Sequence, residues 1–152
     1  MVDILTPDQR TYNMRNVKSR DTTPELLIRK SLHAKGLRYK LHAKNLPGTP
    51  DLVFTKYKTV VFVHGCFWHR HNCHKTSVPA SRIEFWEKKF NDNTTRDKMN
   101  IKYLSDLGWR VLIIWECALK GQTKLPLVFL IEAAVNFIKN DSGQLLELSG
   151  TN

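Results

Sequence analysis

The segment that most constrains this chain is VVFVHGCFWHRHNCH, residues 60–74. It begins as a run of apolar, mostly β-branched residues, which is typical of a strand buried in a sheet. Within a few residues the run changes to histidines, cysteines and two adjacent aromatic side chains. Metal-binding, titratable and stacking groups in one short segment predict a functional site at the end of a buried strand.

The residues that lead into this segment predict a β-hairpin. The run LVFTKYKTVVFVHG, residues 52–65, has apolar blocks on both sides of a polar tip near Tyr57, and the turn-rich LPGTPD, residues 46–51, precedes it. Asp51 lies at the entrance of the hairpin and His64 at its exit. Because antiparallel pairing brings the two ends of a hairpin together, we expect these two side chains to lie close in space.

Two helices are predicted near the N-terminus. Each begins with a threonine that suits the N-cap and a proline that suits the first turn. The two pairs are Thr6-Pro7 and Thr23-Pro24. The helices would span roughly residues 7–18 and 24–35, and Gly36 would end the second.

The C-terminal half predicts two more helices around one strand. Residues 82–107 have a helical pattern with a break near NDNTT, residues 91–95, and WRVLIIW, residues 109–115, is a continuous apolar strand. Residues 126–140 predict a C-terminal helix. A length of 152 residues fits one domain. The predicted fold is therefore an α/β (α+β) arrangement, a central mixed β-sheet flanked by helices.

The charge balance favours a polyanionic partner. Lysine and arginine outnumber aspartate and glutamate by 24 to 14, and the pI is about 9.7. Such a basic domain is typical of nucleic-acid binding, with an anionic membrane surface as the second candidate. No apolar run approaches the roughly 20 residues needed to cross a bilayer, so nucleic acid is favoured.

The expected cellular compartment decides how the cysteines are interpreted. The first ten residues lack a secretion-signal pattern, so a cytoplasmic location is expected. There, three cysteines predict metal ligands or buried thiols and not a disulfide framework. Cys66, His71 and Cys73, with Cys117 after the second strand, would suit a tetrahedral Zn²⁺ site. Their spacing matches no common zinc-finger repeat, and buried free thiols beside surface histidines remain the alternative.

Four titratable residues suggest phosphodiester hydrolysis. Asp51 opens the hairpin and Glu25 lies on an early helix, and carboxylates of this kind hold Mg²⁺ in nucleases. Taken alone, Asp51 would be a turn residue and Glu25 a favourable charge at a helix N-terminus. His64 and His69 beside such a carboxylate have the pKa range of a general acid or base, which favours catalysis over simple binding.

Large apolar side chains near this site predict contact with bases. Phe67 and Trp68 lie between a candidate metal ligand and His69, and rigidly held aromatics can wedge between base steps. Unstacking is least costly where a pair is already mismatched. Trp86 and Met14 are each compatible with the same role or with ordinary core packing.

The chain resembles the very short patch repair endonucleases, which are bacterial mismatch nickases of the same broad fold group as type II restriction enzymes. The motifs that carry the resemblance lie between about residues 10 and 120. They are NMR at 13–15, TPE at 23–25, LPGTPDLVF at 46–54, VFVHGCFWHRHNC at 61–73, VPASRIEFW at 78–86 and GWRVLIIWECAL at 108–119.

The resemblance implies an activity and a set of partners. Such an enzyme recognises the T·G mismatch left when 5-methylcytosine deaminates within a methyltransferase target, and nicks the strand 5′ of the thymine. The substrate would be double-stranded DNA, with a functional link to a cytosine-5 methyltransferase and a repair polymerase. We also expect a monomer, located in the cytoplasm and associated with the nucleoid.

The resemblance also implies roles for the catalytic residues. Asp51 and the main-chain carbonyl of Val63 would bind catalytic Mg²⁺. His69 would be the general base, and His64 and Glu25 would support the phosphate and the metal-bound water. Relatives often carry threonine where this chain has Val63, and that change removes a hydroxyl while leaving the carbonyl.

The remaining implied roles are structural or DNA-contacting. A structural Zn²⁺ would bind the Cys66, His71, Cys73 and Cys117 set. Phe67, Trp68 and Trp86 would form an intercalating wedge, with Met14 entering the other groove. Residues 1–20 would then be a DNA-contacting helical arm, and residues 21–152 one endonuclease domain with a restriction-endonuclease-like core. A nuclease that cuts matched duplexes and a non-catalytic, zinc-stabilised DNA-binding module are the alternatives.

Overall fold

The computed structural model describes residues 21–71, 73, 77 and 79–151. In this part of the chain the strands form one five-stranded sheet in the order β1-β2-β3-β4-β5. The first two pairs are antiparallel and the last two are parallel. The strands are β1 (Lys40–Leu41), β2 (Leu52–Phe54), β3 (Thr59–His64), β4 (Arg110–Trp115) and β5 (Leu145–Leu148). The predicted mixed sheet and the predicted hairpin, β2 with β3, are thus confirmed.

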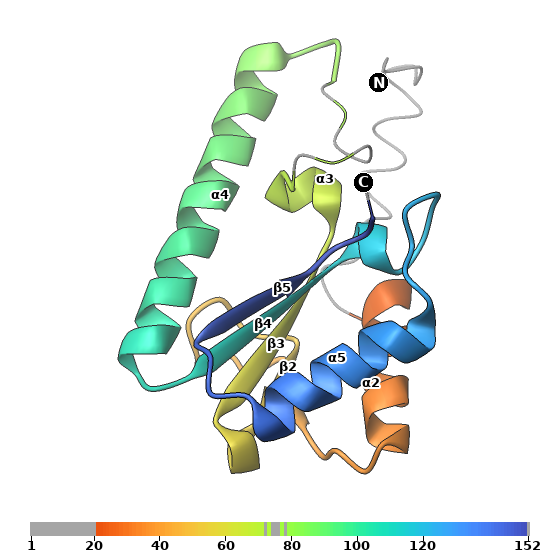
Figure 1. Ribbon diagram of the computed structural model, residues 1–152. Helices are drawn as coiled ribbons and strands as arrows, with labels where there is room; N and C mark the ends of the chain where they lie inside the picture. Colours follow the sequence, from red (N-terminus) through yellow and green to blue (C-terminus); the bar gives the residue numbers. More distant parts are fainter. Residues whose placement is uncertain (1–20, 72, 74–76, 78, 152) are drawn as a thin grey trace.

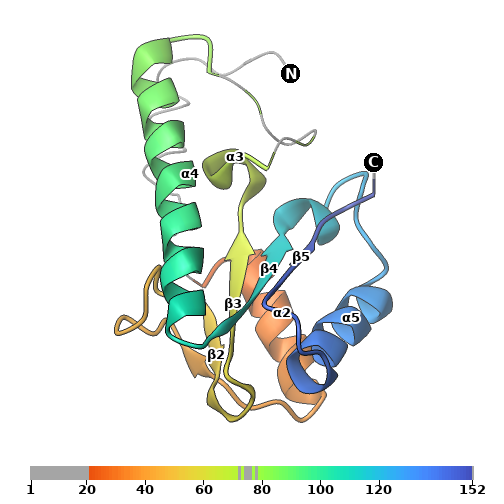
Figure 2. The ribbon, with the colours of Figure 1, turned by 60° about the vertical axis from the view of Figure 1, so that its left-hand side comes forward.

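Helices cover both faces of this sheet. Helices α2 (Thr23–Ala34) and α5 (Leu127–Asn140) lie side by side on one face, and the long helix α4 (Ile83–Asp106) stands apart from them along the opposite side (Figures 1 and 2). The short helix α3 (Cys66–His69) follows directly from the end of β3 and packs against α4. The chain is therefore layered as helix, sheet, helix, as the sequence predicts.

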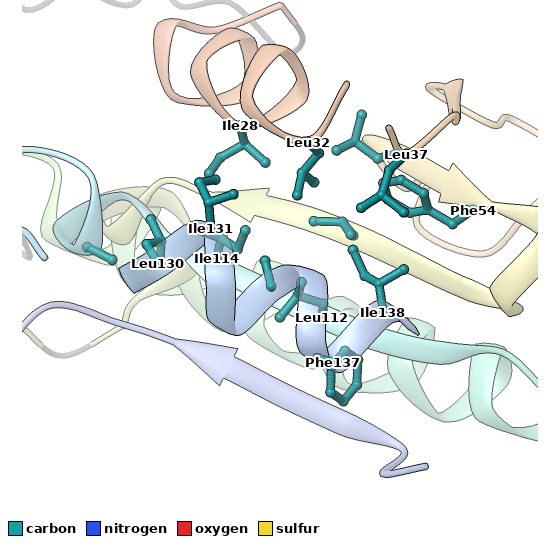
Figure 3. Close-up of a cluster of buried hydrophobic side chains, with 14 residues drawn as sticks. Ile28, Leu32, Leu37, Phe54, Leu112, Ile114, Leu130, Ile131, Phe137 and Ile138 are labelled. Atoms are coloured by element: carbon teal, nitrogen blue, oxygen red, sulfur yellow. The ribbon is translucent and has the colours of Figure 1, made fainter. Parts of the chain in front are cut away.

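Alternation along the central strands explains why they are apolar throughout. Val61, Leu112 and Ile114 point to the α2 and α5 side, where they form a core with Ile28 and Phe137 (Figure 3). The residues that alternate with them, which include Val60, Phe62 and Ile113, pack in a second cluster with Leu104 of α4. A strand that is buried on both faces needs an apolar side chain at every position.

Helix α2 begins one residue earlier than predicted. Its N-cap is Thr22 and not Thr23, and the Thr22 hydroxyl accepts a hydrogen bond of 3.3 Å from the Glu25 N–H. Pro24 is tolerated because the N–H groups of the first turn have no intrahelical partner. Gly36 follows the helix with φ +86, as its predicted role as a stop requires. The helix predicted at residues 7–18 lies outside the described residues.

Helix α4 is continuous over 24 residues, so the break predicted near Asn91–Thr95 is wrong. Trp86, Phe90 and Leu104 bury one side of the helix at both ends of this polar stretch. A few residues of modest helix propensity cost only about 0.5 kcal/mol each, and burial of the flanking aromatic residues outweighs that cost. None of the helices in the described residues is long and apolar enough to cross a membrane.

Candidate active site

A cavity of about 550 Å³ opens where β2 begins and β3 ends. The hairpin supplies Asp51 and His64 to its wall, so the sequence-based expectation that these two lie close is met. Helix α3 adds His69 and helix α4 adds Asp97. The segment after β1 contributes His42.

Gly48 shapes one wall of this cavity. Its φ is +77, and a Cβ at this position would lie 3.0 Å from Asn100 Nδ2 and 3.1 Å from Phe62 Cζ. Only glycine allows the loop to approach α4 this closely without displacing a neighbour. The loop therefore narrows the cavity between the hairpin and the helix.

Asp51 is held at the mouth of the hairpin by the neighbouring strand. One of its oxygens, Oδ2, accepts a 2.7 Å hydrogen bond from the N–H of Val63. Burial raises the pKa of Asp51 to about 7, and the nearby negative charge of Glu25 adds to this while the Val63 N–H opposes it. A cation bound at this carboxylate would favour its ionised form.

His64 and His69 form a stacked pair. Their ring centroids are 3.7 Å apart and the planes differ by 3°. His64 is 7% exposed, and its Nδ1 is buried without a hydrogen-bond partner among the described residues. Burial, and then the proximity of His69, hold the pKa of His64 well below its usual value. His64 is thus favoured in its neutral form.

Asp97 orients the second histidine of the pair. Its Oδ2 lies 2.5 Å from Nδ1 of His69, across 28 residues of sequence. His69 is the last residue of α3. With Nδ1 engaged, Nε2 is the nitrogen that remains for chemistry, which is the geometry of a carboxylate-supported base.

Glu25 is held beside this cavity by three donors. It is 2% exposed, although it lies in the first turn of α2. Oε2 contacts His42 Nε2 at 2.8 Å and Arg29 Nη1 at 3.1 Å, and Oε1 accepts from the Asp21 N–H at 3.1 Å. The interpretation of Glu25 as only a favourable charge at a helix N-terminus is therefore insufficient.

The four cysteine and histidine side chains predicted as metal ligands converge in a second cluster. Their donor atoms all lie within 4.8 Å of one another in Cys66, His71, Cys73 and Cys117. His71 Nδ1 is 3.8 Å from Cys66 Sγ and 3.4 Å from Cys117 Sγ. Tetrahedral coordination with bonds of about 2.0 Å to nitrogen and 2.3 Å to sulfur needs donor separations of roughly 3.5–3.8 Å. The cluster thus has the geometry to hold a metal ion.

The surroundings of this cluster also suit a structural metal. Cys66 and Cys117 are buried, and the Gly150 N–H donates to Cys117 Sγ at 3.3 Å. Burial raises the pKa of the Cys66 thiol, so the free thiol is protonated and a metal ion would displace the proton. Trp115 stacks on the His71 ring with centroids 4.2 Å apart.

Aromatic side chains of α3 and α4 form a cluster outside the cavity. The Phe67 ring meets those of Trp68, Trp86 and Phe90 edge-on, with centroids 5.1 to 6.0 Å apart. Phe67 and Trp68 are partly exposed, whereas Trp86 is only 4% exposed. Trp86 therefore packs as a core residue in this conformation. Met14 lies outside the described residues.

Sequence analysis did not identify two residues of this site. Asp97 sits in the polar sequence TTRDKMN and His42 in KLHAKN, and neither has a motif around it. The periodicity of α4 does contain a weak signal, because Asp97 lies four residues before Ile101, which also lines the cavity. His42 has no comparable signal.

Comparison with known proteins gives consistent matches. The profile of the family described as DNA mismatch endonuclease Vsr matches residues 2–75. The DNA mismatch endonuclease Vsr of Escherichia coli is 46% identical over 125 residues, which cover 82% of this chain and 80% of the relative.

Two type II nicking enzymes are similarly related. V.XorIIP of Xanthomonas oryzae is 46% identical over 119 residues, covering 78% of this chain and 88% of the relative. V.NmeAIP of Neisseria meningitidis is 44% identical over 122 residues, covering 80% of this chain and 87% of the relative. These matches confirm the resemblance found in the sequence motifs. The chain belongs to the DNA mismatch endonuclease Vsr family.

Proposed function

We propose that this protein is a strand-specific DNA mismatch endonuclease. It nicks the strand 5′ of the thymine in a T·G mismatch that arises from deamination of 5-methylcytosine, and so initiates very short patch repair. The observation that carries the proposal is the single cavity in which Asp51, His64 and His69 meet, in a chain of the Vsr family.

The scaffold of the proposed enzyme is a restriction-endonuclease-like core within one domain, residues 21–152. Its support is the mixed sheet, in which an antiparallel hairpin presents a carboxylate at its entrance and the adjoining strand pairs in parallel. Residues 1–20 would form an arm that contacts DNA.

Asp51 and the main-chain carbonyl of Val63 are proposed to hold a catalytic Mg²⁺. Asp51 fits this role because it is a partly buried carboxylate whose raised pKa a bound cation would lower. When bound, Mg²⁺ would polarise the scissile phosphate and activate the attacking water. Val63 contributes only backbone atoms, so its side chain need not carry a hydroxyl.

His69 is proposed as the general base. Asp97 fixes the ring through Nδ1, so Nε2 would take the proton from the attacking water while the carboxylate stabilises the charged imidazole. His64 keeps the ring plane of His69 in place by stacking. His64 and Glu25 would support the phosphate and the water from either side of Asp51.

The cysteine and histidine cluster is proposed to bind a structural Zn²⁺. Two buried thiols, a third cysteine and one imidazole are a set of ligands that Zn²⁺ prefers, and the set leaves no position for substrate. The ion would join Cys66 and Cys73 around α3 to Cys117 after β4, and so fix the segment that carries His69.

The aromatic cluster is proposed to recognise the mismatch by intercalation. Phe67 and Trp68 are the exposed part of the wedge, and Trp86 supports them from α4 at 6.0 Å from each ring. Met14 would enter from the other groove. Unstacking costs about a few kcal/mol and least at a mismatched pair, so the wedge would favour T·G over a matched site.

The proposed partners follow from this activity. The substrate is double-stranded DNA, and the formal charge of +10 supports its binding. A cytosine-5 methyltransferase would create the target base and a repair polymerase would use the nick. One lesion needs one active site, so a monomer in the cytoplasm, at the nucleoid, is the proposed working form.

A set of end-labelled duplexes tests the proposal. Duplexes carrying T·G, C·G or T·A at one position, in varied flanking sequences, are incubated with the Zn²⁺-loaded protein and Mg²⁺. A single nick 5′ of the thymine, only in T·G duplexes, is the expected result. Equal cutting of matched duplexes would indicate a restriction-like nuclease, and binding without cutting would indicate a non-catalytic DNA-binding module.

A further inference from the structure

The carboxylate of Glu25 has an unusually complete set of donors for a residue in the first turn of a helix. A buried carboxylate is costly unless hydrogen bonds compensate for the lost water. Here the shortest of the three contacts is the one to His42, at 2.8 Å. His42 comes from a different element, 17 residues along the chain. The position of Glu25 therefore depends on the segment after β1.

His42 is itself fixed by contacts to the site. Its backbone has φ +47, a left-handed conformation that is unfavourable for a residue with a Cβ. The N–H of His42 donates to the main-chain oxygen of Asp51 at 3.1 Å, and its side chain, 14% exposed, lines the cavity. A residue in this conformation persists because the surrounding contacts determine it. His42 thus links Glu25 to Asp51 through one backbone bond and one side-chain bond.

Two carboxylates this close would otherwise repel each other. The negative charge of Glu25 is one of the causes that raise the pKa of Asp51, and His42 acts in the opposite direction. Arg29 supplies a full positive charge to the outer side, at 2.7 Å from Asp21 and 3.1 Å from Glu25. Because that guanidinium already pairs with both Asp21 and Glu25, a cation bound by this cluster would have to displace it or be repelled by it.

We propose that His42 is a positioning residue for the metal site at Asp51, and that it acts through Glu25. The hydrogen bond from the imidazole holds the Glu25 carboxylate beside Asp51, where it would support a metal ion bound there. This inference rests on the proposed function of Asp51 as a metal ligand. It adds the contact between His42 and Glu25, which depends on the edge strand β1. No sequence motif contains His42.

The test compares three substitutions. His42→Leu removes the donor at similar volume, and His42→Gln keeps an N–H donor that reaches the carboxylate. His33→Leu on α2 is the matched control, because His33 is exposed and does not line the cavity. For each variant we would measure the Mg²⁺ concentration for half-maximal nicking, the KM for T·G duplex and the melting temperature.

A second readout is independent of nicking. Mn²⁺ is titrated into the Zn²⁺-loaded full-length chain, free Mn²⁺ is followed by electron paramagnetic resonance, and the Asp51→Ala variant supplies the background. For His42→Leu we expect the half-saturating Mg²⁺ concentration and the Mn²⁺ dissociation constant to rise about tenfold. KM for DNA should stay close to the parent, and the melting temperature should fall by only a few degrees, because the buried Glu25 carboxylate loses one of its three donors. His42→Gln should recover most of the loss, and His33→Leu should match the parent.

The pathway through Glu25 is tested by a double variant. If His42 acts only through this carboxylate, His42→Leu has no further effect on Mn²⁺ binding in a Glu25→Gln background. Parental Mn²⁺ binding by His42→Leu would overturn the proposal. Equal losses of Mn²⁺ affinity in His42→Leu and His42→Gln would also overturn it, because the effect would then come from the imidazole ring and not from its N–H donor. If the parent nicks no T·G duplex, the proposed function fails while the Mn²⁺ titration still decides this inference.

Discussion

Two polar clusters share the short segment around α3, and they differ in what surrounds them. The proposed catalytic cavity takes His64 and His69 from the segment around this helix, and the cysteine and histidine cluster takes Cys66 and His71 from the same segment. Each is completed by a distant residue. Asp97 of α4 completes the first, and Cys117 after β4 completes the second.

The difference lies in how the polar atoms are satisfied. In the cavity, the two imidazoles stack on each other, Asp97 bonds to one of them, and the group lines an open space. In the cluster, the buried thiols of Cys66 and Cys117 approach one imidazole at 3.8 and 3.4 Å, and Cys117 also accepts a hydrogen bond from the Gly150 N–H. Loss of the first should therefore affect catalysis alone, whereas loss of the second should affect folding.

The largest effect is expected from Cys117→Ser. Removing one ligand of a structural metal site takes away binding free energy that is also folding free energy, a loss of several kcal/mol. The protein should lose its zinc and melt roughly 10 °C or more below the parent. Zinc content by mass spectrometry and thermal unfolding would check this. A variant that keeps its zinc and the parental melting temperature would show that the four ligands are wrongly assigned.

Asp51→Ala should abolish nicking without affecting the cysteine and histidine cluster. Without this carboxylate the catalytic metal is lost, and nicking of T·G duplex should fall at least about 10³-fold. Binding to the duplex, the zinc content and the melting temperature should all remain. Asp106→Ala, which removes an exposed carboxylate at the end of α4, is the matched control and should nick normally. Nicking that survives in Asp51→Ala would exclude Asp51 as the metal ligand.

The sequence predicts these clusters to different extents, and the physical reason is sequence distance. His64, Cys66, His69 and His71 fall in eight residues, so their convergence needs only a local turn after a strand. Cys117 could be predicted as a fourth ligand because the chain has only three cysteines, and the other two lie in this segment or next to it. Asp97 is one of 14 aspartate and glutamate residues, so the sequence does not single it out as a partner of His69. Its role depends on how α4 packs across the sheet, which periodicity alone does not determine.

The same argument holds for the strands. The hairpin and β4 are long apolar runs that are buried on both faces, and they are predicted from sequence. The edge strands β1 and β5 are not, because β1 has two exposed residues and the four residues of β5 alternate between exposed and half-buried. Edge strands obtain their structure from a neighbour more than from their own composition. His42, which directly follows β1, was missed for this reason.

Asp97→Asn tests how much the cavity depends on its distant member. The amide keeps the size of the side chain but removes the charge that orients His69 and stabilises it when protonated, so kcat should fall about 10²-fold or more. KM for the duplex and the melting temperature should not change. Asp92→Asn on the same helix, where the carboxylate pairs with exposed Lys88, is the control. Equal kcat values for the two variants would remove Asp97 from the catalytic group.

The smallest effect is expected at the aromatic cluster of α3 and α4. Trp68→Ala removes the partly exposed ring of the proposed wedge, while the backbone carbonyl at this position can still accept its 3.3 Å hydrogen bond from Asn93. Loss of one base-stacking side chain should weaken binding to T·G duplex by about 1–3 kcal/mol. Affinity for the matched duplex should change less, because intact base pairs resist the wedge. Phe85→Ala removes an exposed ring that also packs on Trp86, and it should leave the T·G preference intact. If both variants lose the preference equally, recognition depends on general aromatic packing of α4 and not on the wedge, and the aromatic cluster then belongs with the structural side of the molecule.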